Sequence, residues 1–335
     1  MSPANVGGAA DGTVSPHPLV VHRLIVAVAA GIAAGLCAFA VYRGRPLSVS
    51  DFDAIWTGAR ALRAHGDPYA AIQSPPWPWN LQYPLPAVLV ALPVSYLSLA
   101  PARAAWMALG VGLLAWALTR KAWWPLIALA SGQAFVSVQS VQWTPLLAAG
   151  VLLAPLQVLW AVKPTSGLPL FAGYPNRRTV VGGLVLLALA FLAWPHWLDG
   201  WLVAAHRAPH RPALQRPGGI LLLLALLRWR LPEGRQLAAL ALMPLAPHLY
   251  EALPLLLVAR SRRELLALAG CGTLGLLAVA LLPQGSDPDH GAIAWIEILV
   301  SCYLPALLVV LKHPNNAVGL LAPFEPIPAS VRRNG

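Results

Sequence analysis

The sequence predicts an all-α integral membrane protein that crosses the bilayer many times. Of its 335 residues, 58% are hydrophobic and only 10% are charged, whereas soluble domains carry about 25% charged residues. Mean hydropathy is +0.65, and several uncharged stretches approach the roughly 20 residues that a spanning helix needs. We therefore expect one transmembrane domain of about eight or nine spans over residues 20–312, between a disordered tail at 1–19 and a cytoplasmic tail at 313–335.

The distribution of charge predicts the orientation of these spans. The net charge of +11 does not require a nucleic acid partner, because basic residues mark the cytoplasmic loops of membrane proteins. Assigning the basic segments to the inside leaves six of the seven aspartates outside, although the aspartates were not used in the assignment. We expect a multi-pass protein of the plasma membrane. The basic segments are 120–121, 177–178, 228–235, 260–263, 312 and 332–333.

The first third of the chain alternates between apolar and polar stretches. Residues 24–42 are uncharged and form the first span, which runs outward; a cleaved signal is the alternative. Residues 43–83 form the longest polar loop, on the outer side. Four prolines interrupt residues 83–102, which predicts a short or re-entrant helix. Residues 104–119 return to the cytoplasm.

The remaining crossings follow the same hydropathy criterion. A polar elbow at 139–143 joins two of the expected spans. The loop at 163–178 is then cytoplasmic, and so is Lys163 at its start, whereas the loop at 198–217 is external. The expected spans are 122–138, 144–162, 179–197, 265–282 and 292–311.

Residues 236–259 allow two topologies. If the basic residues on both sides are cytoplasmic, this proline-broken segment enters and returns as two half-helices; otherwise it crosses once. It carries His248 and Glu251, and ionisable residues inside an apolar segment are candidates for function. A buried pair with a purely structural role is the alternative for both.

An amphipathic helix is predicted in the first external loop, just after Ser50. Asp51 and Asp53 stand in its first turn, and Ser50 with Asp53 resembles a capping box. The helix should end at His65-Gly66. Its apolar positions recur at helical spacing and are Phe52, Ile55, Trp56, Ala59 and Leu62.

The two aspartates have two interpretations. Carboxylates in a first helical turn complement the helix dipole, each by about 0.3–1 kcal/mol. Alternatively, an aspartate shielded by a loop over a membrane cavity could take a proton from a sugar hydroxyl. Asp51 and Asp53 are both candidates for such a base.

Several segments, in this order along the chain, resemble glycosyltransferase family 87, a family of membrane enzymes with the GT-C fold. It includes mannosyltransferases that use polyprenyl-phosphate-mannose. The resemblance covers roughly residues 20–260. Its segments are DFDAIWTGARALRAHGDPY (51–69), YPLPAVLVALP (83–93) with Trp106 downstream, SGQAFVSVQ (131–139) and AVKPTSGLP (161–169).

The resemblance implies transfer of a sugar, mannose in the family's mannosyltransferases, from a polyprenyl phosphate to a lipid or glycan acceptor at the outer face. Asp51 aligns with the family's catalytic aspartate, whereas Asp53 falls at a variable position. The matching segments also contain candidate substrate-binding residues, which are Tyr69, Tyr83, Gln133 and Lys163.

A phosphate leaving group needs positive charge and hydrogen-bond donors. The external loops supply Arg60, His206, Arg207 and Arg211 for this role, and the broken segment supplies His248. Attraction to anionic lipid headgroups is the alternative for each arginine.

Glu251 and Trp77 are further candidates for substrate binding, since an indole can stack on a sugar ring. We expect no metal site and no cofactor, because no spacing of His, Cys, Asp or Glu is typical of metal ligands.

Two other functions fit parts of the same sequence. A lipid or small-molecule transporter or flippase also uses broken helices and intramembrane ionisable residues. No internal repeat supports that alternative. A non-catalytic, degenerate member of the family would also account for the short chain.

Overall fold

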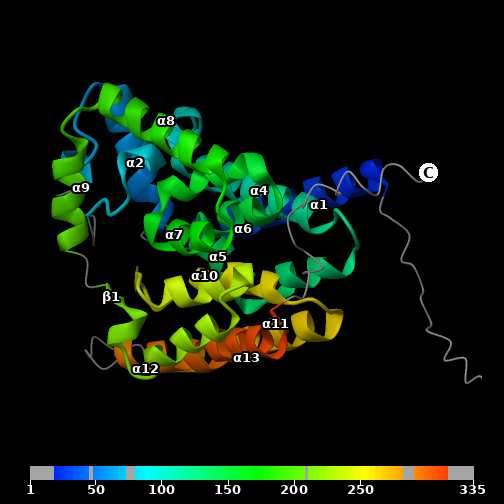
Figure 1. The fold of residues 1–335 in the computed structure, drawn as a ribbon. Coiled ribbons are helices and arrows are strands. Elements are labelled where there is room, and N and C mark those ends of the chain that lie inside the picture. Colours follow the sequence, from blue (N-terminus) through cyan, green and yellow to red (C-terminus); the bar gives the residue numbers. More distant parts are fainter. Residues whose placement is uncertain (1–18, 45–47, 73–79, 208–209, 282–289, 316–335) are drawn as a thin grey trace, which may run out of the picture.

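The described part of the protein is predominantly helical, as the sequence predicts (Figure 1). The computed structural model describes residues 19–44, 48–72, 80–207, 210–281 and 290–315. In these ranges the only sheet is a two-residue antiparallel ribbon, in which β1 (Arg211–Pro212) pairs with β2 (Pro244–Leu245). The expectation of an all-α membrane protein is confirmed at this level.

Many of the helices are short. The α-helices are α1 (Val20–Arg43), α2 (Asp51–Arg63), α3 (Leu85–Ala91), α4 (Leu99–Leu118), α5 (Gly132–Gln139), α6 (Thr144–Leu152), α7 (Pro164–Gly173), α8 (Arg177–Ala193), α9 (Trp197–His206), α10 (Pro232–Leu240), α11 (Arg262–Leu281), α12 (His290–Ile298) and α13 (Leu304–Lys312). The 3₁₀ segments are η1 (Ala70–Ile72), η2 (Leu92–Tyr96), η3 (Trp124–Ala130), η4 (Ala154–Val162), η5 (Ala213–Gln215), η6 (Gly219–Arg228) and η7 (Leu249–Val258). A π-helical turn, η8 (Leu299–Tyr303), joins α12 to α13.

Three helices of the described residues are long and apolar enough to cross a membrane. They are Val20–Arg43, Leu99–Leu118 and Ala294–Lys312. The α8–α9 pair, bent by 107°, is a fourth if it is counted as one broken span. Eight or nine spans therefore remain a prediction. Two of the expected spans are divided, 122–138 into η3 and α5 and 144–162 into α6 and η4.

The helices α1 and α4 form an antiparallel pair through small residues. Gly31 and Gly35 of α1 lie against the α4 backbone, and a Cβ added at Gly31 would lie 2.5 Å from the carbonyl oxygen of Ala108. Small residues allow such close approach between membrane helices. The other face of α1 is apolar and exposed, as a lipid-facing surface would be; it includes Leu24, Ile25, Val28, Ile32 and Leu36.

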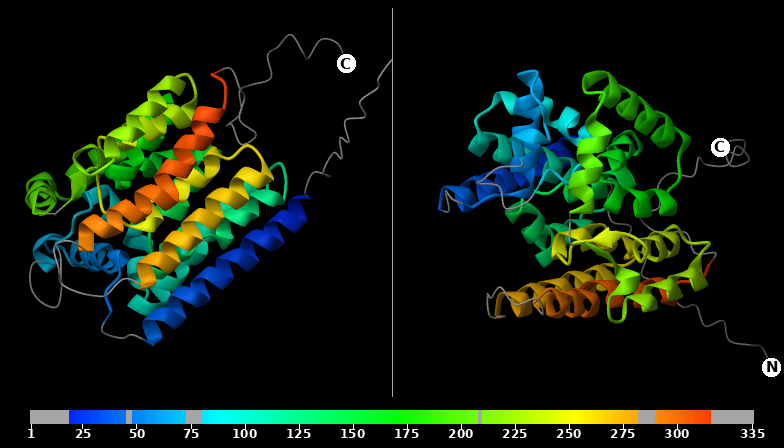
Figure 2. Two further views of the ribbon diagram at one scale, coloured as in Figure 1. Left: turned by 90° about the horizontal axis from the view of Figure 1, so that it is seen from below. Right: turned by 90° about the vertical axis from the view of Figure 1, so that its left-hand side faces the viewer.

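The α1–α4 pair gives the molecule two ends. At one end, Arg103 near the start of α4 lies 3.9 Å from the ring centroid of Tyr42, near the end of α1. At the other, Arg23 donates to the carbonyl of Trp116 at 3.0 Å. With 24 residues, α1 is about 36 Å long. In Figure 2 (left), α1 in dark blue lies roughly parallel to α11 and α13 in yellow and red.

The ambiguous segment around 236–259 enters and returns on the same side. It forms α10 and η7, joined through β2. Arg260, after η7, pairs with Glu233 at the start of α10, with 3.6 Å between Nη2 and Oε2. Because its two ends meet, the segment is a helical hairpin. Of the two expected topologies, the one with two half-helices matches this arrangement.

Candidate functional site

A polar cavity of about 750 Å³ lies among the described helices. Its walls come from the start of α2, the residues before α3, the start of α7, the end of α9 and the loop before η7. Apart from these polar groups the molecule is largely apolar, so their convergence marks the cavity as the candidate site. The charged, imidazole and aromatic residues in its wall are Asp51, Tyr83, Lys163, Trp201, Arg207, His210, His248, Tyr250 and Glu251.

Asp51, the first residue of α2, is half-buried in the cavity wall. Its Oδ2 accepts hydrogen bonds from the amide of Gln142 and from the hydroxyl of Tyr250, the latter at 3.2 Å. No donor in the described ranges contacts Oδ1. One oxygen is therefore held in place and the other is available to a bound molecule.

Asp53 occupies a different environment, although it is only two residues further on. Its side chain is 1% exposed and forms an ion pair with Arg103, whose Nε lies 2.7 Å from Oδ1. Ser50 donates its backbone N–H at 2.8 Å and its hydroxyl at 2.6 Å. Asp53 does not line the cavity. Its two oxygens serve the helix start and the Arg103 contact, which corrects its place among the candidate bases.

An aromatic cluster aligns Asp51 with Gln142. Phe52, next to Asp51, stacks on Trp106 of α4 with 5.2 Å between ring centroids. Trp143, next to Gln142, meets the same indole edge-on at 4.5 Å. All three rings are nearly fully buried. Trp106 thus fixes the distance between two polar residues that are 91 positions apart in the chain.

Lys163 lies in the same cavity wall as Asp51, so the expectation that the two residues lie on opposite sides of the membrane is wrong. The segment η4 leads the chain back from the far end of α6, and Lys163 follows it directly. Its Nζ lies 2.7 Å from Oε1 of Glu251 and donates to Oε1 of Gln142 at 3.2 Å. Ser166 donates to the other carboxylate oxygen of Glu251 at 2.7 Å.

The two histidines of the cavity wall are uncharged at neutral pH. Burial lowers the pKa of His248 below its usual value, against the opposing effect of Asp51 and Glu251. Burial likewise lowers the pKa of His210. The His248 ring stacks on Tyr250 with 5.2 Å between centroids. A neutral imidazole has one N–H donor, so each of these histidines can donate one hydrogen bond to a bound anion.

The tyrosines of the matching segments hold one another in place. Tyr69 is buried and donates to the carbonyl of Tyr83 at 3.2 Å. Tyr83 lines the cavity, and its hydroxyl lies 3.5 Å from Oε1 of Gln142. Burial raises the pKa of Tyr83 well above its usual value, so the hydroxyl is protonated and can donate. Tyr69 supports the wall without lining it.

Gln133 lies away from the cavity. It is 2% exposed, and its amide donates weakly to the sulfur of Cys302 at 3.5 Å. A Cβ added at Gly272 of α11 would overlap its side chain. Gln133 therefore packs helix against helix, and the Gly-Gln element contributes no cavity residue in this structure. Gln133 does not line the described cavity, so its role in substrate binding stays a prediction.

Among the residues expected to bind phosphate, Arg207 and His248 line the cavity. His206 and Arg211 are exposed and do not line it. Arg60 is exposed on α2 and lies over the ring of Trp56, 4.8 Å from its centroid. The cavity therefore retains two of the five expected residues.

The cavity wall contains a tryptophan that the sequence did not predict. Trp77 falls outside the described residues. Trp201 of α9 is in the cavity wall, and its Nε1 donates to the carbonyl of Gln82 at 2.9 Å. That bond fixes the indole beside Tyr83, where it can contact a sugar ring.

Sequence reasoning missed three residues of the network, namely Gln142, Ser166 and Tyr250. Gln142 belongs to the polar elbow at 139–143, which was interpreted only as a connection. Ser166 is three residues after Lys163, and Tyr250 is adjacent to Glu251. Their polarity inside apolar surroundings was the available signal. The pairing with Asp51 is not readable from sequence, because Tyr250 is 199 positions away.

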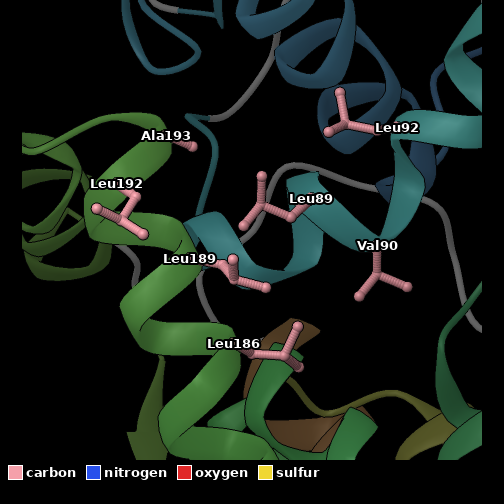
Figure 3. Close-up of a pocket in the computed structure, with 7 residues that line it drawn as sticks. All are labelled: Leu89, Val90, Leu92, Leu186, Leu189, Leu192 and Ala193. Carbon is pink, nitrogen blue, oxygen red and sulfur yellow. The ribbon is translucent and has the colours of Figure 1, made fainter.

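A separate apolar groove of about 520 Å³ lies where α3 meets α8 (Figure 3). Leu89, Val90 and Leu92 form one side, and four residues of α8 form the other. The helix α3 begins two residues after Tyr83, and α8 leads into α9. The same two parts of the chain thus border both the groove and the polar cavity.

Comparisons with family models, with curated proteins and with solved structures found no match to this chain. A reaction must therefore be argued from the cavity and from the segments that carry the resemblance. In the described ranges, no group of three or more His, Cys, Asp or Glu residues is arranged to hold a metal ion.

Proposed function

We propose that this protein is a membrane glycosyltransferase that moves a sugar from a polyprenyl-phosphate donor to a lipid or glycan acceptor. The observation that carries the proposal is the state of Asp51. Its carboxylate borders a polar cavity, with one oxygen held by Gln142 and Tyr250 and the other available. A positioned carboxylate of this kind suits a general base.

The proposed reaction is an inverting displacement. Asp51 takes the proton of the acceptor hydroxyl while the hydroxyl oxygen forms a bond to the anomeric carbon. The bond between that carbon and the lipid phosphate breaks, and the phosphate leaves as an anion. Lys163 and Arg207 supply positive charge in the cavity wall, and His210 and His248 supply neutral donors.

The groove between α3 and α8 supports a lipid-linked donor. Leucine, valine and alanine form its entire described lining, which suits a hydrocarbon tail. In this proposal the isoprenoid lies in the groove and the sugar phosphate reaches the cavity past Tyr83.

The distribution of charge supports catalysis at the outer face of the plasma membrane. Arg23 and Arg120 lie at the end of the α1–α4 pair opposite to Asp51, and basic ends are cytoplasmic. A multi-pass GT-C-like bundle with α2 at the outer interface completes the proposal. Mannose is the sugar that the resemblance favours.

The test is a transfer assay on the purified protein with radiolabelled polyprenyl-phosphate-mannose and a panel of acceptors. We expect Asp51→Asn to lower kcat by about 10²–10⁴-fold, because the variant cannot accept a proton. The matched control is Asp67→Asn, which lies outside the cavity and whose carbonyl can still accept the N–H of Tyr69. Undiminished transfer by Asp51→Asn would remove Asp51 as the base.

A transporter or flippase is the second candidate, favoured by two observations. The 107° bend between α8 and α9 and the hairpin of α10 and η7 are broken-helix features, which transporters also use. The same protein in vesicles separates the two functions. Movement of the labelled lipid between leaflets without sugar transfer would favour transport.

A further inference from the structure

Gln142 connects Asp51 to the buried pair of Lys163 and Glu251. It is fully buried. Its Oε1 accepts from Nζ of Lys163 at 3.2 Å and lies 3.5 Å from the hydroxyl of Tyr83. An ammonium can only donate, so the oxygen end of the amide must face Lys163, and the phenol of Tyr83 donates to the same oxygen. The NH₂ end is thereby directed at Oδ2 of Asp51, to which it donates.

The backbone before Gln142 is strained. The helix α5 ends in a Schellman motif, in which Val141 donates to Val138 at 3.2 Å and Gln142 donates to Ser137 at 2.9 Å. The left-handed position of this motif is normally glycine, but here it is Val141, with φ of 51°. A β-branched residue in this region is an outlier. Such strain persists where surrounding structure over-determines it, and it is concentrated at functional sites.

We propose that Gln142 is a positioning residue for Asp51, through which the pair of Lys163 and Glu251 holds that carboxylate aimed at the cavity. This inference rests on the proposed function, because it assigns Asp51 the role of the base. Glu251 orients Lys163, Lys163 orients the amide of Gln142, and the amide holds Oδ2 of Asp51. Oδ1 then remains open toward a substrate hydroxyl.

Other titratable groups also act on Asp51. Tyr250 donates directly to its Oδ2. Electrostatic effects couple Asp51 to Tyr42, Tyr83 and His248 as well. None of these groups is cationic at neutral pH, since they are phenols and a buried, neutral imidazole. Lys163 is thus the cation that hydrogen bonds connect to Asp51: Lys163 donates to Gln142, and Gln142 donates to Asp51.

The first test measures the ionisation of Asp51 without any sugar transfer. The full-length protein in detergent is treated with a water-soluble carbodiimide and an amine over a range of pH, and mass spectrometry quantifies labelling at Asp51. Carbodiimide reacts with the protonated carboxyl group. We expect Gln142→Met to move the half-labelling pH of Asp51 upward by about one unit, because the carboxylate loses a donor.

Two further variants complete the first test. Gln157 is another buried glutamine, 3% exposed and paired with Thr179 outside the cavity. Gln157→Met should therefore leave the half-labelling pH of Asp51 unchanged. Lys163→Gln keeps a donor for Glu251 but removes the charge, and it should shift the curve in the same direction as Gln142→Met. If Gln142→Met does not fold, the labelling curve of Lys163→Gln tests the proposal instead.

The second test uses the pH dependence of kcat. A base must be ionised to act, so a higher half-protonation pH moves the loss of activity at acidic pH to a higher pH. We expect the acidic limb in Gln142→Met to move upward with the labelling curve. An unchanged labelling curve in folded Gln142→Met and Lys163→Gln overturns the positioning role. A shifted curve in a protein that transfers no sugar overturns the proposed function instead.

Discussion

Asp51 and Asp53 show how two identical side chains on one helix serve different purposes. A helical residue advances about 100° around the axis, so the two carboxylates point in nearly opposite directions. Asp51 borders the cavity, and Asp53 is enclosed by Arg103 and Ser50. The capping-box interpretation is therefore confirmed for Asp53. The interpretation as a base stays a proposal, for Asp51 alone.

The end of α2 gives a second prediction at the scale of single residues. The predicted stop at His65-Gly66 is confirmed, but His65 and not Gly66 adopts the left-handed conformation, with φ of 57°. Because glycine carries no Cβ, His65→Gly should stabilise the protein by about 1 kcal/mol. Thermal unfolding in detergent would report this as a higher midpoint. His65→Ala retains a Cβ and should show no such gain; equal midpoints for the two variants would contradict the explanation.

At the scale of elements, the contact between α1 and α4 depends on the absence of side chains. A Cβ added at Gly31 would lie 2.5 Å from the carbonyl oxygen of Ala108 and 3.4 Å from Cα of Gly112. Gly31→Leu should therefore separate the helices and destabilise the protein by about 2 kcal/mol. A lower unfolding midpoint in detergent would be the measured result.

The control for this prediction lies on the same helix. Ile32 is 55% exposed on the outer face of α1, so Ile32→Ala should change the midpoint little. If Ile32→Ala and Gly31→Leu lowered it equally, the cause would be the helix itself and not its contact with α4.

Prolines decided which predicted elements are continuous. The four prolines at 83–102 predicted a short helix, and the chain there forms α3 and η2 before α4 begins. Pro125, Pro145 and Pro155 stand at the first or second positions of η3, α6 and η4. A hydropathy window does not detect where a helix begins. The expected spans 122–138 and 144–162 therefore merged η3 with α5 and α6 with η4. Proline at the first turn was the signal that could have divided them.

The orientation of the whole molecule gives the last prediction. Arg60 and Arg178 are both exposed; Arg60 belongs to the helix that Asp51 begins, and Arg178 lies in a basic segment. With the native cysteines replaced by alanine, Arg60→Cys should react with an impermeant maleimide applied outside intact cells. Arg178→Cys should react only after permeabilisation. Labelling of both from one side would contradict the proposed orientation.

The sequence by itself determined the class of the protein, because hydropathy and helical period are local properties. It predicted the amphipathic helix between Ser50 and His65-Gly66 with its cap and its stop, and it identified His248 and Glu251 as unusual. Asp51, Lys163 and Glu251 were named as candidates from separate segments, and Asp51 and Lys163 were expected on opposite sides of the membrane.

Only the tertiary structure decided that these residues share one cavity. The contacts of Gln142 and Tyr250 with Asp51 join residues 91 and 199 positions apart. Such contacts depend on how η4 and the α10–η7 hairpin turn back, which no local pattern encodes. Burial of Lys163 is acceptable only because Glu251 and Gln142 pair with it. The sequence lists the polar groups, and the packing of the helices selects their partners.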